Sequence, residues 1–473
     1  MLSVSNQYPQ QLLGTDFATE LRFSKQSAGE LCEVLILGSS GERCLRFVGV
    51  LSPQGWPIAV GDRLMWAVSA QVTMTGPLEG IRIIELCSAI SGPFACKLLG
   101  DAGAEVIKIE SPGGGAADRV RGLPYDTHDH DTFTWRFLNY NTSKASVTVD
   151  LKADAGTEVF ERLLGDADAL VENMRPGSME RLGFGWETIR TMNPELVYCS
   201  IKGYGPEGPY SDMPALDTLV QGVSGFATQV GTHDRPETMD VLIVDMMTGL
   251  YATWAVTSAL YERSHSGEGQ RVTVSMLDAT ISMLGHQLAE YTGGRRADDY
   301  EPRYGPAFAP NGYFRAADGY LGLFVIDDHW EGFCAAIDRE GWADRDHPYA
   351  TNDARLDRHD RLREDLEGVL GERTVEEWIA RFEDHEATIL AAPVNDIEGM
   401  IEHPQVRAQG AVVERDHPVL GKHAAPNFVP EFSRTPGDIN DAPDLGTATD
   451  DVLGKLGYDE DDRERLREQG VVD

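Results

Sequence analysis

The side chain with the clearest chemical potential is a carboxylate, Asp217, which lies between a loop and a helical run. The loop, residues 203–214, is rich in glycine and proline, and the segment after Asp217 reads TLVQGVSGF. A carboxylate can attack an acyl carbonyl and hold the acyl group covalently. The same side chain at the start of a helix can also act only as an N-cap. From the pattern alone the cap is the favoured interpretation.

A second feature is the turn CSAISGP, residues 87–93, which follows a short apolar strand and precedes a helix. The N–H groups and the dipole of a helix N-terminus attract an anion such as phosphate. The turn lacks the glycine pattern G-x-G-x-x-G, which marks dinucleotide sites. The sequence therefore argues against an NAD enzyme and indicates an anion site of unspecified kind.

A cluster of His128, Asp129, His130 and Asp131 has the residue types of a metal site. We interpret it as a polar surface loop, because adjacent loop residues rarely point at one ion and no distant third ligand is suggested. The six cysteines form no C-x-x-C pair, and we interpret them as buried apolar thiols. We expect neither a metal site nor a tightly bound cofactor.

An alternating α/β pattern that begins near residue 74 must position these candidates. Residues 81–86 and 105–109 have the apolar pattern of strands, and the helix between them opens at Gly92-Pro93, with proline suited to the first turn. Strand, helix and strand at this spacing predict a parallel βαβ unit. The other expected elements are strands at 169–173 and 196–205 and helices at 155–164, 186–192, 246–264, 274–290 and 460–469.

The region from about residue 291 to residue 395 has a different texture, which predicts a second, smaller domain. Residues 311–325 have the pattern of a β-hairpin with Asp318-Gly319 at its turn. Acidic helices are expected after this hairpin.

The chain carries a formal net charge of −36 from 77 acidic and 41 basic residues. Nucleic acids and anionic membranes require clustered Lys and Arg, so neither is expected as a partner. No apolar run reaches the ~18 residues of a membrane span, and no signal-peptide pattern precedes the first strand, so we expect a cytoplasmic protein. A carboxylate-rich, lysine-poor surface suits a salt-loaded cytoplasm, which screens charges over ~3 Å at 1 M salt. We infer a halophilic source.

The first 73 residues differ from the rest, with six acids and five bases and only short apolar runs. Two interpretations compete. The segment is either a small appended β-rich domain or an extension that results from an upstream choice of start codon, with Met74 as the native start. The break in charge at residue 73 favours the second.

Many ordered motifs from residue 74 onward resemble the family III coenzyme A (CoA) transferases, which include related acyl-CoA racemases. The motifs are GPLEGIRIIEL, SGPFACKLLGDAGAEVIKIE, NTSKASVTVDLK, ALVENMRPGSMERLGFGWE, NPELVYCSIKGYG, PALDTLVQGVSGF, GEGQRVTVSMLDA, IEHPQVRAQG and DLGTATDDVLGKLGY. The resemblance implies CoA transfer between carboxylic acids, with Asp217 as the nucleophile that forms a mixed anhydride and then an aspartyl-CoA thioester. It implies no metal or redox cofactor. The CoA thioester itself is a substrate.

The resemblance also implies which residues contact CoA. They are Ala89, Ile90, Ser91, Lys144, Asn173, Met174, Arg181 and Lys202.

The fold that the resemblance implies is α/β, with a doubly wound parallel-sheet large domain, an inserted smaller α+β domain and an interlocked homodimer. The expected divisions are residues 1–73 as an extension, 74–275 as the first part of the large domain, 276–395 as the small domain and 396–473 as a tail that completes the large domain.

The residues distinguish less sharply among the individual members of this family. Racemases of this group carry a His where this chain has Leu216, which argues against a racemase even though Asp245 could supply an acid. The formyl-CoA:oxalate type has a run of four glycines where residues 304–314 read YGPAFAPNGYF. Succinyl-CoA as donor and mesaconate or another dicarboxylate as acceptor are therefore favoured, with carnitine, malate and oxalate as alternatives. A non-enzymatic CoA-binding scaffold is disfavoured because Asp217 is present.

Overall fold

The computed structural model describes residues 76–119, 134–294, 308–385, 389–417 and 421–473, together with the backbone of five strands nearer the N-terminus. The chain divides into two compact units, residues 1–75 with 433–435 and residues 76–432 with 436–473. The first unit contains an antiparallel sheet of order β1-β2-β3 and an antiparallel pair, β4-β5. These strands are β1 (Phe17–Gln26), β2 (Gly29–Gly38), β3 (Arg43–Val50), β4 (Pro57–Val60) and β5 (Arg63–Trp66). Both interpretations of residues 1–73 stay predictions.

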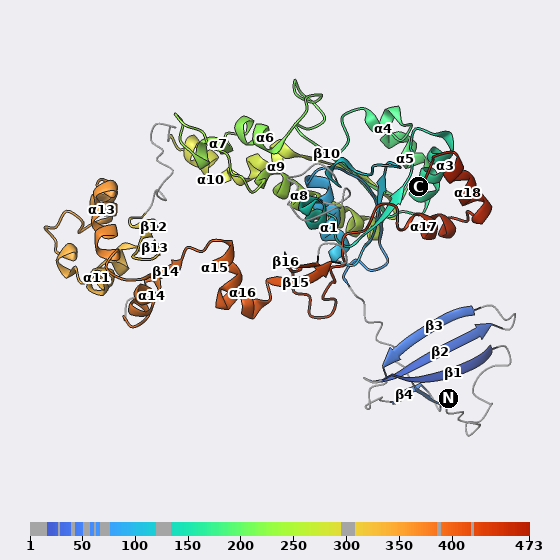
Figure 1. Ribbon diagram of the computed structural model, residues 1–473, viewed down its shortest axis with the longest axis horizontal. Helices are drawn as coiled ribbons and strands as arrows, with labels where there is room; N and C mark the ends of the chain where they lie inside the picture. The colour runs from blue at the N-terminus through green and yellow to red at the C-terminus, as the bar shows by residue number, and fades with distance from the viewer. Residues whose placement is uncertain are drawn as a thin grey trace. The chain divides into compact units, whose positions relative to one another are not determined.

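A six-stranded parallel sheet organises the second unit (Figure 1). Its order is β11-β10-β9-β6-β7-β8, so the chain starts in the middle, winds outward to β8 and then crosses back to β9 on the other side of β6. This double winding is the Rossmann-type strand order. The strands are β6 (Arg82–Leu86), β7 (Glu105–Glu110), β8 (Lys144–Thr148), β9 (Ala169–Glu172), β10 (Val197–Lys202) and β11 (Arg271–Ser275).

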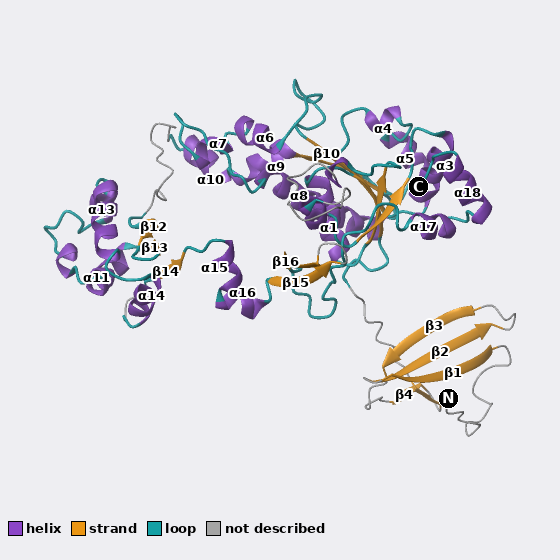
Figure 2. Cartoon of the chain, viewed as in Figure 1, coloured by secondary structure: helices purple, strands orange, loops and turns teal. Residues whose placement is uncertain are grey.

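Helices cover both faces of this sheet (Figure 2). Successive strand residues point to opposite faces, so Ile83 packs in the core under α1 and α8 while Ile84 packs in the core under α3 and α5. The helices α17 and α18 belong to the second of these cores. The helices involved are α1 (Ser91–Asp101), α3 (Asp154–Gly165), α5 (Trp186–Met192), α8 (Ile243–Ser266), α17 (Thr449–Lys455) and α18 (Glu460–Glu468). The expectation of an α/β fold with a parallel sheet is confirmed.

Two elements differ from the sequence-based expectation. Strand β8 was not predicted, and the run expected as one helix over residues 274–290 begins instead with the end of β11 and continues as two helices. The segment RVTVS is rich in β-branched residues, which favour strands, but it leads without a break into the apolar pattern of the next helix. Those helices are α9 (Met276–Met283) and α10 (Gly285–Thr292).

Residues 309–382 form a separate apolar core of their own. The expected hairpin at residues 311–325 is present as an antiparallel pair, and a third strand joins it to give the order β12-β13-β14. The elements here are β12 (Asn311–Arg315), β13 (Tyr320–Phe324), α11 (Asp327–Ala336), η3 (Glu340–Ala343), α12 (Asn352–Leu356), α13 (His359–Leu370), α14 (Val375–Glu383) and β14 (Leu390–Pro393). The boundaries of an inserted domain stay a prediction.

The end of the chain returns to the parallel sheet. Side chains of Leu453, Leu466 and Val471 are buried in the core under α3, and the Asp150 N–H donates to the Val471 carbonyl at 2.8 Å. The remaining elements are η1 (Ala117–Arg119), α2 (Trp135–Tyr140), α4 (Ser178–Arg181), α6 (Asp217–Val223), α7 (Phe226–Val230), α15 (Ile397–Glu402), α16 (Pro404–Gln409), β15 (Val412–His417) and β16 (Gly421–Pro426). No helix among the described residues is long and apolar enough to span a bilayer.

Candidate active site

The reversal of winding between β6 and β9 creates a topological switch point. Ligands of doubly wound sheets bind in the crevice outside the carboxyl ends of such strands. Here the two segments that leave the strands hold each other: the Ser88 N–H donates to Asn173 Oδ1 at 2.9 Å, and Asn173 Nδ2 donates to the Ser88 carbonyl at 2.7 Å. The turn after β6 and the turn after β9 are therefore fixed as one unit, and both contain residues expected to contact CoA.

A cavity of about 320 Å³ opens at these strand ends. Its walls come from the carboxyl ends of β6, β7, β8 and β9, and they include Ser88, Lys152, Asn173 and Met174. This volume lies in the range of ligand pockets. The structure thus places Asn173 and Met174 on a cavity of suitable size, beside the turn of Ala89.

The turn itself is shaped by close packing. Ala89 is exposed and has φ = 62°, a left-handed conformation that non-glycine residues rarely adopt. Ile90 and Ser91 are buried at the start of α1. At Gly92 a Cβ atom would lie 2.4 Å from Cys87 Sγ, so only glycine fits there.

A fully buried charge cluster lies beneath this turn. Glu85 accepts a hydrogen bond from Lys108 Nζ at 2.8 Å and forms an ion pair with Lys144 Nζ at 2.8 Å, and all three side chains are 0% exposed. Burial alone would raise the pKa of Glu85, but the two ammonium groups lower it overall. Lys108 also donates to the Cys87 carbonyl, and Lys144 donates to the Pro93 carbonyl, each at 2.9 Å. The cluster therefore fixes both ends of the turn.

This geometry does not support the expected contact between Lys144 and the nucleotide. Lys144 Nζ also donates to Asn141 Oδ1 at 2.9 Å, so its three donors are directed at Glu85, Asn141 and Pro93, and solvent does not reach it. Sequence motifs record that a basic residue is present, but they do not tell whether its side chain points outward or into the protein.

Lys202 lies at the carboxyl end of β10 and pairs with the buried Glu172 on β9. Its Nζ donates to both Glu172 oxygens, at 2.9 and 3.0 Å, and to the Met174 carbonyl at 2.8 Å. The Tyr198 hydroxyl also donates to Glu172. Burial, and to a smaller extent the Glu172 carboxylate, raises the pKa of Tyr198. A smaller cavity of about 120 Å³ is lined by Glu172, Tyr198, Lys202 and Arg175. Lys202 therefore anchors the segment that carries Met174.

Arg181 is exposed at the end of α4, where its Nη2 donates to Ser178 Oγ at 2.8 Å. Its guanidinium group is open to solvent. The structure leaves it accessible for a phosphate without placing it on either of the two cavities described above.

Asp217 is the first residue of α6 and is only 4% exposed. Its Oδ1 accepts from Gln221 Nε2 at 2.5 Å, and its Oδ2 accepts from the backbone N–H groups of Val244 at 2.8 Å and Asp245 at 3.1 Å. Those two N–H groups belong to the first turn of α8, whose dipole favours a negative charge. Asp217 therefore caps α8, a helix remote in sequence, rather than its own helix.

Asp245 is a second carboxylate beside Asp217. Burial, and then repulsion by Asp217, raises the pKa of Asp245 to about 6 from an ordinary value of 3.8, while hydrogen bonds from Ser91 act in the opposite direction. Ser91 belongs to the turn at the switch point. A short chain of contacts therefore connects Asp217, through the start of α8, to the turn after β6.

One further cluster among the described residues has the residue types of a metal site. Among the described residues, Glu85, Cys87 and Cys96 alone have ligand atoms close enough together for one metal ion, but Lys108 and Lys144 already occupy Glu85 and oppose a cation. The His128–Asp131 loop lies outside the described residues.

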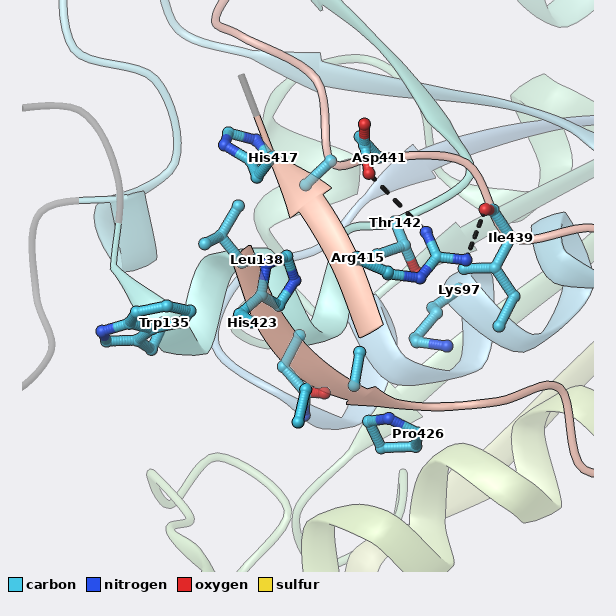
Figure 3. Close-up of a pocket in the computed structure, with 14 residues that line it drawn as sticks. Lys97, Trp135, Leu138, Thr142, Arg415, His417, His423, Pro426, Ile439 and Asp441 are labelled. Atoms are coloured by element: carbon cyan, nitrogen blue, oxygen red, sulfur yellow. Dashed lines mark hydrogen bonds and ion pairs between the residues drawn. The ribbon is translucent and has the colours of Figure 1, made fainter. Parts of the chain in front are cut away.

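A pocket of about 80 Å³ between α1, α2 and the β15–β16 pair contains Lys97, Arg415 and His423 (Figure 3). Its cations are already matched by acids. Arg415 pairs with Asp441 at 3.6 Å and donates to the Ile439 carbonyl at 2.6 Å, and Lys97 pairs with Asp101. We therefore assign no ligand to this pocket.

The fold and the site together define a class: an α/β enzyme with a nucleotide-type crevice at its switch point and a buried carboxylate on a helix N-terminus. Residues 78–449 match the family model described as CoA-transferase family III. The chain is therefore a member of CoA-transferase family III, and it is a CoA-transferase.

Individual relatives agree with this membership. The chain is 32% identical over 432 residues to a formyl-CoA:oxalate CoA-transferase of Bradyrhizobium sp., covering 85% of this chain and 98% of the relative. It is 32% identical over 426 residues to human succinyl-CoA:glutarate CoA-transferase, covering 87% and 94%. A CAIB/BAIF family protein from Brucella suis has a similar structure, with a TM-score of 0.73 at 28% identity over 81% of this chain and all of that one.

Some features of the site were not found from the sequence. The N–H groups of Val244 and Asp245 meet Asp217 only through the tertiary fold, and no local signal marks them. Glu85 and Lys108 are spaced as ordinary strand residues. A charged residue in the middle of an otherwise apolar strand was the available signal, because such a residue must find a buried partner.

Proposed function

We propose that this enzyme transfers CoA through covalent intermediates on Asp217. The carboxylate attacks the thioester carbonyl, the C–S bond breaks, and CoA leaves as a thiolate. The thiolate then attacks the aspartyl carbonyl, which releases the first acid and leaves an aspartyl-CoA thioester. The acceptor acid reverses these steps. The observation that carries the proposal is the burial of Asp217 with four-per-cent exposure, because an anhydride survives only where water is excluded.

The same proposal assigns the CoA moiety to the switch-point crevice. Asn173 and Met174 line the cavity there, and Ala89, Ile90 and Ser91 belong to the adjoining turn, which Asn173 holds through Ser88. Arg181 remains a proposed phosphate contact because its guanidinium is exposed. Lys202 is retained in a supporting role, because its donors are directed at Glu172 and the Met174 carbonyl.

For the substrates, we propose succinyl-CoA as donor and a dicarboxylate as acceptor. The relatives at 32% identity carry names with oxalate and glutarate, which are both dicarboxylates. Mesaconate is the acceptor to test first, given the acidic surface and the halophilic source inferred from it. A racemase would need a proton-transferring side chain before Asp217, and Leu216 cannot transfer a proton.

We also propose that the chain acts as a homodimer. Large apolar side chains are exposed along one stripe of α8, with Leu250 at 47%, Trp254 at 66% and Tyr261 at 70%. Further exposed apolar side chains lie on α6 and α10, including Leu219 and Leu288. Patches of this kind mark protein contacts, and a second copy of the chain is the proposed occupant.

The experiment is a screen of succinyl-CoA against oxalate, glutarate, malate, mesaconate and carnitine in high salt, with Asp217→Ala and Asp217→Asn as variants. Transfer should need both an acyl-CoA and an acid, and both variants should lose it while keeping the far-ultraviolet circular dichroism spectrum of the wild type. Full activity of Asp217→Ala would refute the covalent role. Exchange of the α-hydrogen without an acceptor acid would indicate a racemase instead.

A further inference from the structure

The two oxygens of Asp217 have different surroundings. Oδ2 accepts two hydrogen bonds, from the N–H groups of Val244 and Asp245, whereas Oδ1 accepts one, from Gln221. A carboxylate has about two lone-pair sites on each oxygen. Oδ2 is therefore saturated by fixed backbone donors, and Oδ1 keeps a site with which it can attack.

The partners of both oxygens are held in place. The side-chain amide of Gln221 is itself held by the backbone of Met239. Its Nε2 also donates to the Met239 carbonyl at 3.0 Å, and its Oε1 accepts from the Met239 N–H at 2.9 Å. The start of α8 is set by Leu242, which has φ = 52° and ψ = 45°. Such a conformation persists in a non-glycine residue only when the surroundings require it. Rotation of the carboxylate, which would exchange its two oxygens, would have to break three hydrogen bonds.

We infer that the Val244 and Asp245 N–H groups form an oxyanion hole for the carbonyl of Asp217 itself, with Oδ1 as the nucleophile and Oδ2 as a retained oxygen. This inference rests on the proposed covalent function. An oxyanion hole requires donors 2.7–3.1 Å from the oxygen that becomes charged, and the two distances here are 2.8 and 3.1 Å. The donors are already in place before the reaction.

The chemistry follows with every atom assigned. Oδ1 attacks the thioester carbonyl, and the C–S bond breaks to give the anhydride and the CoA thiolate. The thiolate attacks Cγ of Asp217, and the electron pair of the C=O bond moves onto Oδ2, where the two N–H groups stabilise it. Collapse breaks the Cγ–Oδ1 bond, so Oδ1 leaves with the first acid. The acceptor carboxylate later restores an oxygen at the Oδ1 position, while Oδ2 never leaves Cγ.

An isotope experiment on the unmodified enzyme tests this directly. The enzyme is incubated for many turnovers with succinyl-CoA and succinate in which all four oxygens are oxygen-18, and the peptide containing Asp217 is weighed by mass spectrometry. Retention of Oδ2 predicts a plateau at one heavy oxygen atom in that side chain. Incorporation of two atoms would show that the oxygens exchange roles and would overturn the inference. Incorporation of none, while exchange proceeds, would reject the covalent function itself. If succinate supports no exchange, the acid found active in the screen replaces it, carrying oxygen-18 in its reacting carboxylate.

A backbone substitution tests the rate effect. Replacing Val244 by its α-hydroxy analogue, through cell-free synthesis, converts the N–H into an ester oxygen and removes one donor. We expect release of the first acid in a single turnover without acceptor to slow by roughly 10²–10³-fold, with little change in KM. The matched control is the same replacement at Met246, whose N–H donates to the Leu242 carbonyl at 3.1 Å and not to Asp217.

If the Val244 ester fails to fold, the α-hydroxy analogue of Asp245 removes the other donor and carries the same prediction. A folded ester variant at either position that releases the first acid at the wild-type rate would contradict the inference while leaving the covalent function intact.

Discussion

The buried cluster of Glu85, Lys108 and Lys144 beneath the turn at residues 87–93 allows a prediction by counting charges. Lys108 and Lys144 carry two positive charges against the single negative charge of Glu85, and none of the three side chains reaches solvent. Lys144→Met leaves one matched pair and removes the donor to the Pro93 carbonyl. Glu85→Gln leaves two buried ammonium groups without the carboxylate that both of them contact, although Lys108 keeps the attraction of Asp118 and Glu110. The loss of the acid should therefore destabilise the fold more than the loss of either base.

The magnitudes follow from measured costs of breaking buried ion pairs, about 3–5 kcal/mol. We assign about 3 kcal/mol to Lys144→Met and about 5 kcal/mol to Glu85→Gln. With a urea dependence of about 3 kcal/mol per molar for a large chain, the unfolding midpoint should fall by about 1 M and about 1.7 M. The assay is urea unfolding at constant salt, followed by circular dichroism.

A control for these two variants is Arg162→Met. It removes an exposed pair with Glu158, whose side chains are 44% and 58% exposed, and surface pairs contribute at most about 1 kcal/mol. The reasoning is refuted if Lys144→Met lowers the midpoint as much as Glu85→Gln does, or if both variants unfold at the midpoint of the control.

Three further predictions concern neighbouring features. The pKa of Asp245 is raised from 3.8 to about 6, so its contribution to stability is present below pH 4 and is lost as the pH rises to 6. The free energy of unfolding of Asp245→Asn should therefore exceed that of the wild type by up to about 3 kcal/mol at pH 7.5 and by little at pH 4. Urea unfolding at both pH values measures the difference. A Cβ at Gly249 would lie 2.9 Å from the Ser91 carbonyl, so Gly249→Ala should lower the free energy of unfolding by about 1–3 kcal/mol and raise the KM for acyl-CoA. The control, Gly368→Ala, places its Cβ in open space on α13 and should raise the free energy of unfolding by about 0.5–1 kcal/mol. Equal effects of the two variants would contradict this prediction. Trp254→Ser should weaken the proposed homodimer in sedimentation experiments, and an unchanged dimer would place the contact elsewhere.

Local sequence patterns were sufficient for the elements of the parallel sheet that have long apolar runs. The unit from β6 through α1 to β7 was predicted within one or two residues, because an apolar strand and a Gly-Pro helix start both signal locally. The boundary between β11 and α9 at residue 275 was not predicted. The reason is that β11 is a short edge strand that pairs with β10, which lies some 70 residues earlier in the chain. Pairing of that kind has no local signature.

The same distinction holds for the candidate site. Asp217 and the turn at residues 87–93 could be proposed from residue type and resemblance. The partners of Asp217 could not, because Val244 contributes only its backbone N–H, which is the same in every residue except proline. Lys144 shows the opposite difficulty: its motif suggested a ligand contact, but its side chain is directed inward by Glu85, an acid on a different strand.

The position of the last residues has a consequence for biosynthesis. Leu453, Leu466 and Val471 complete the apolar layer under α3, so a ribosome must synthesise the chain through residue 471 before that layer can close. Until then the nascent strands expose apolar surface, and exposed surface of this kind promotes aggregation during slow, long-range assembly. Synthesis of this enzyme should therefore depend on chaperones that shield the early strands until the final helix emerges.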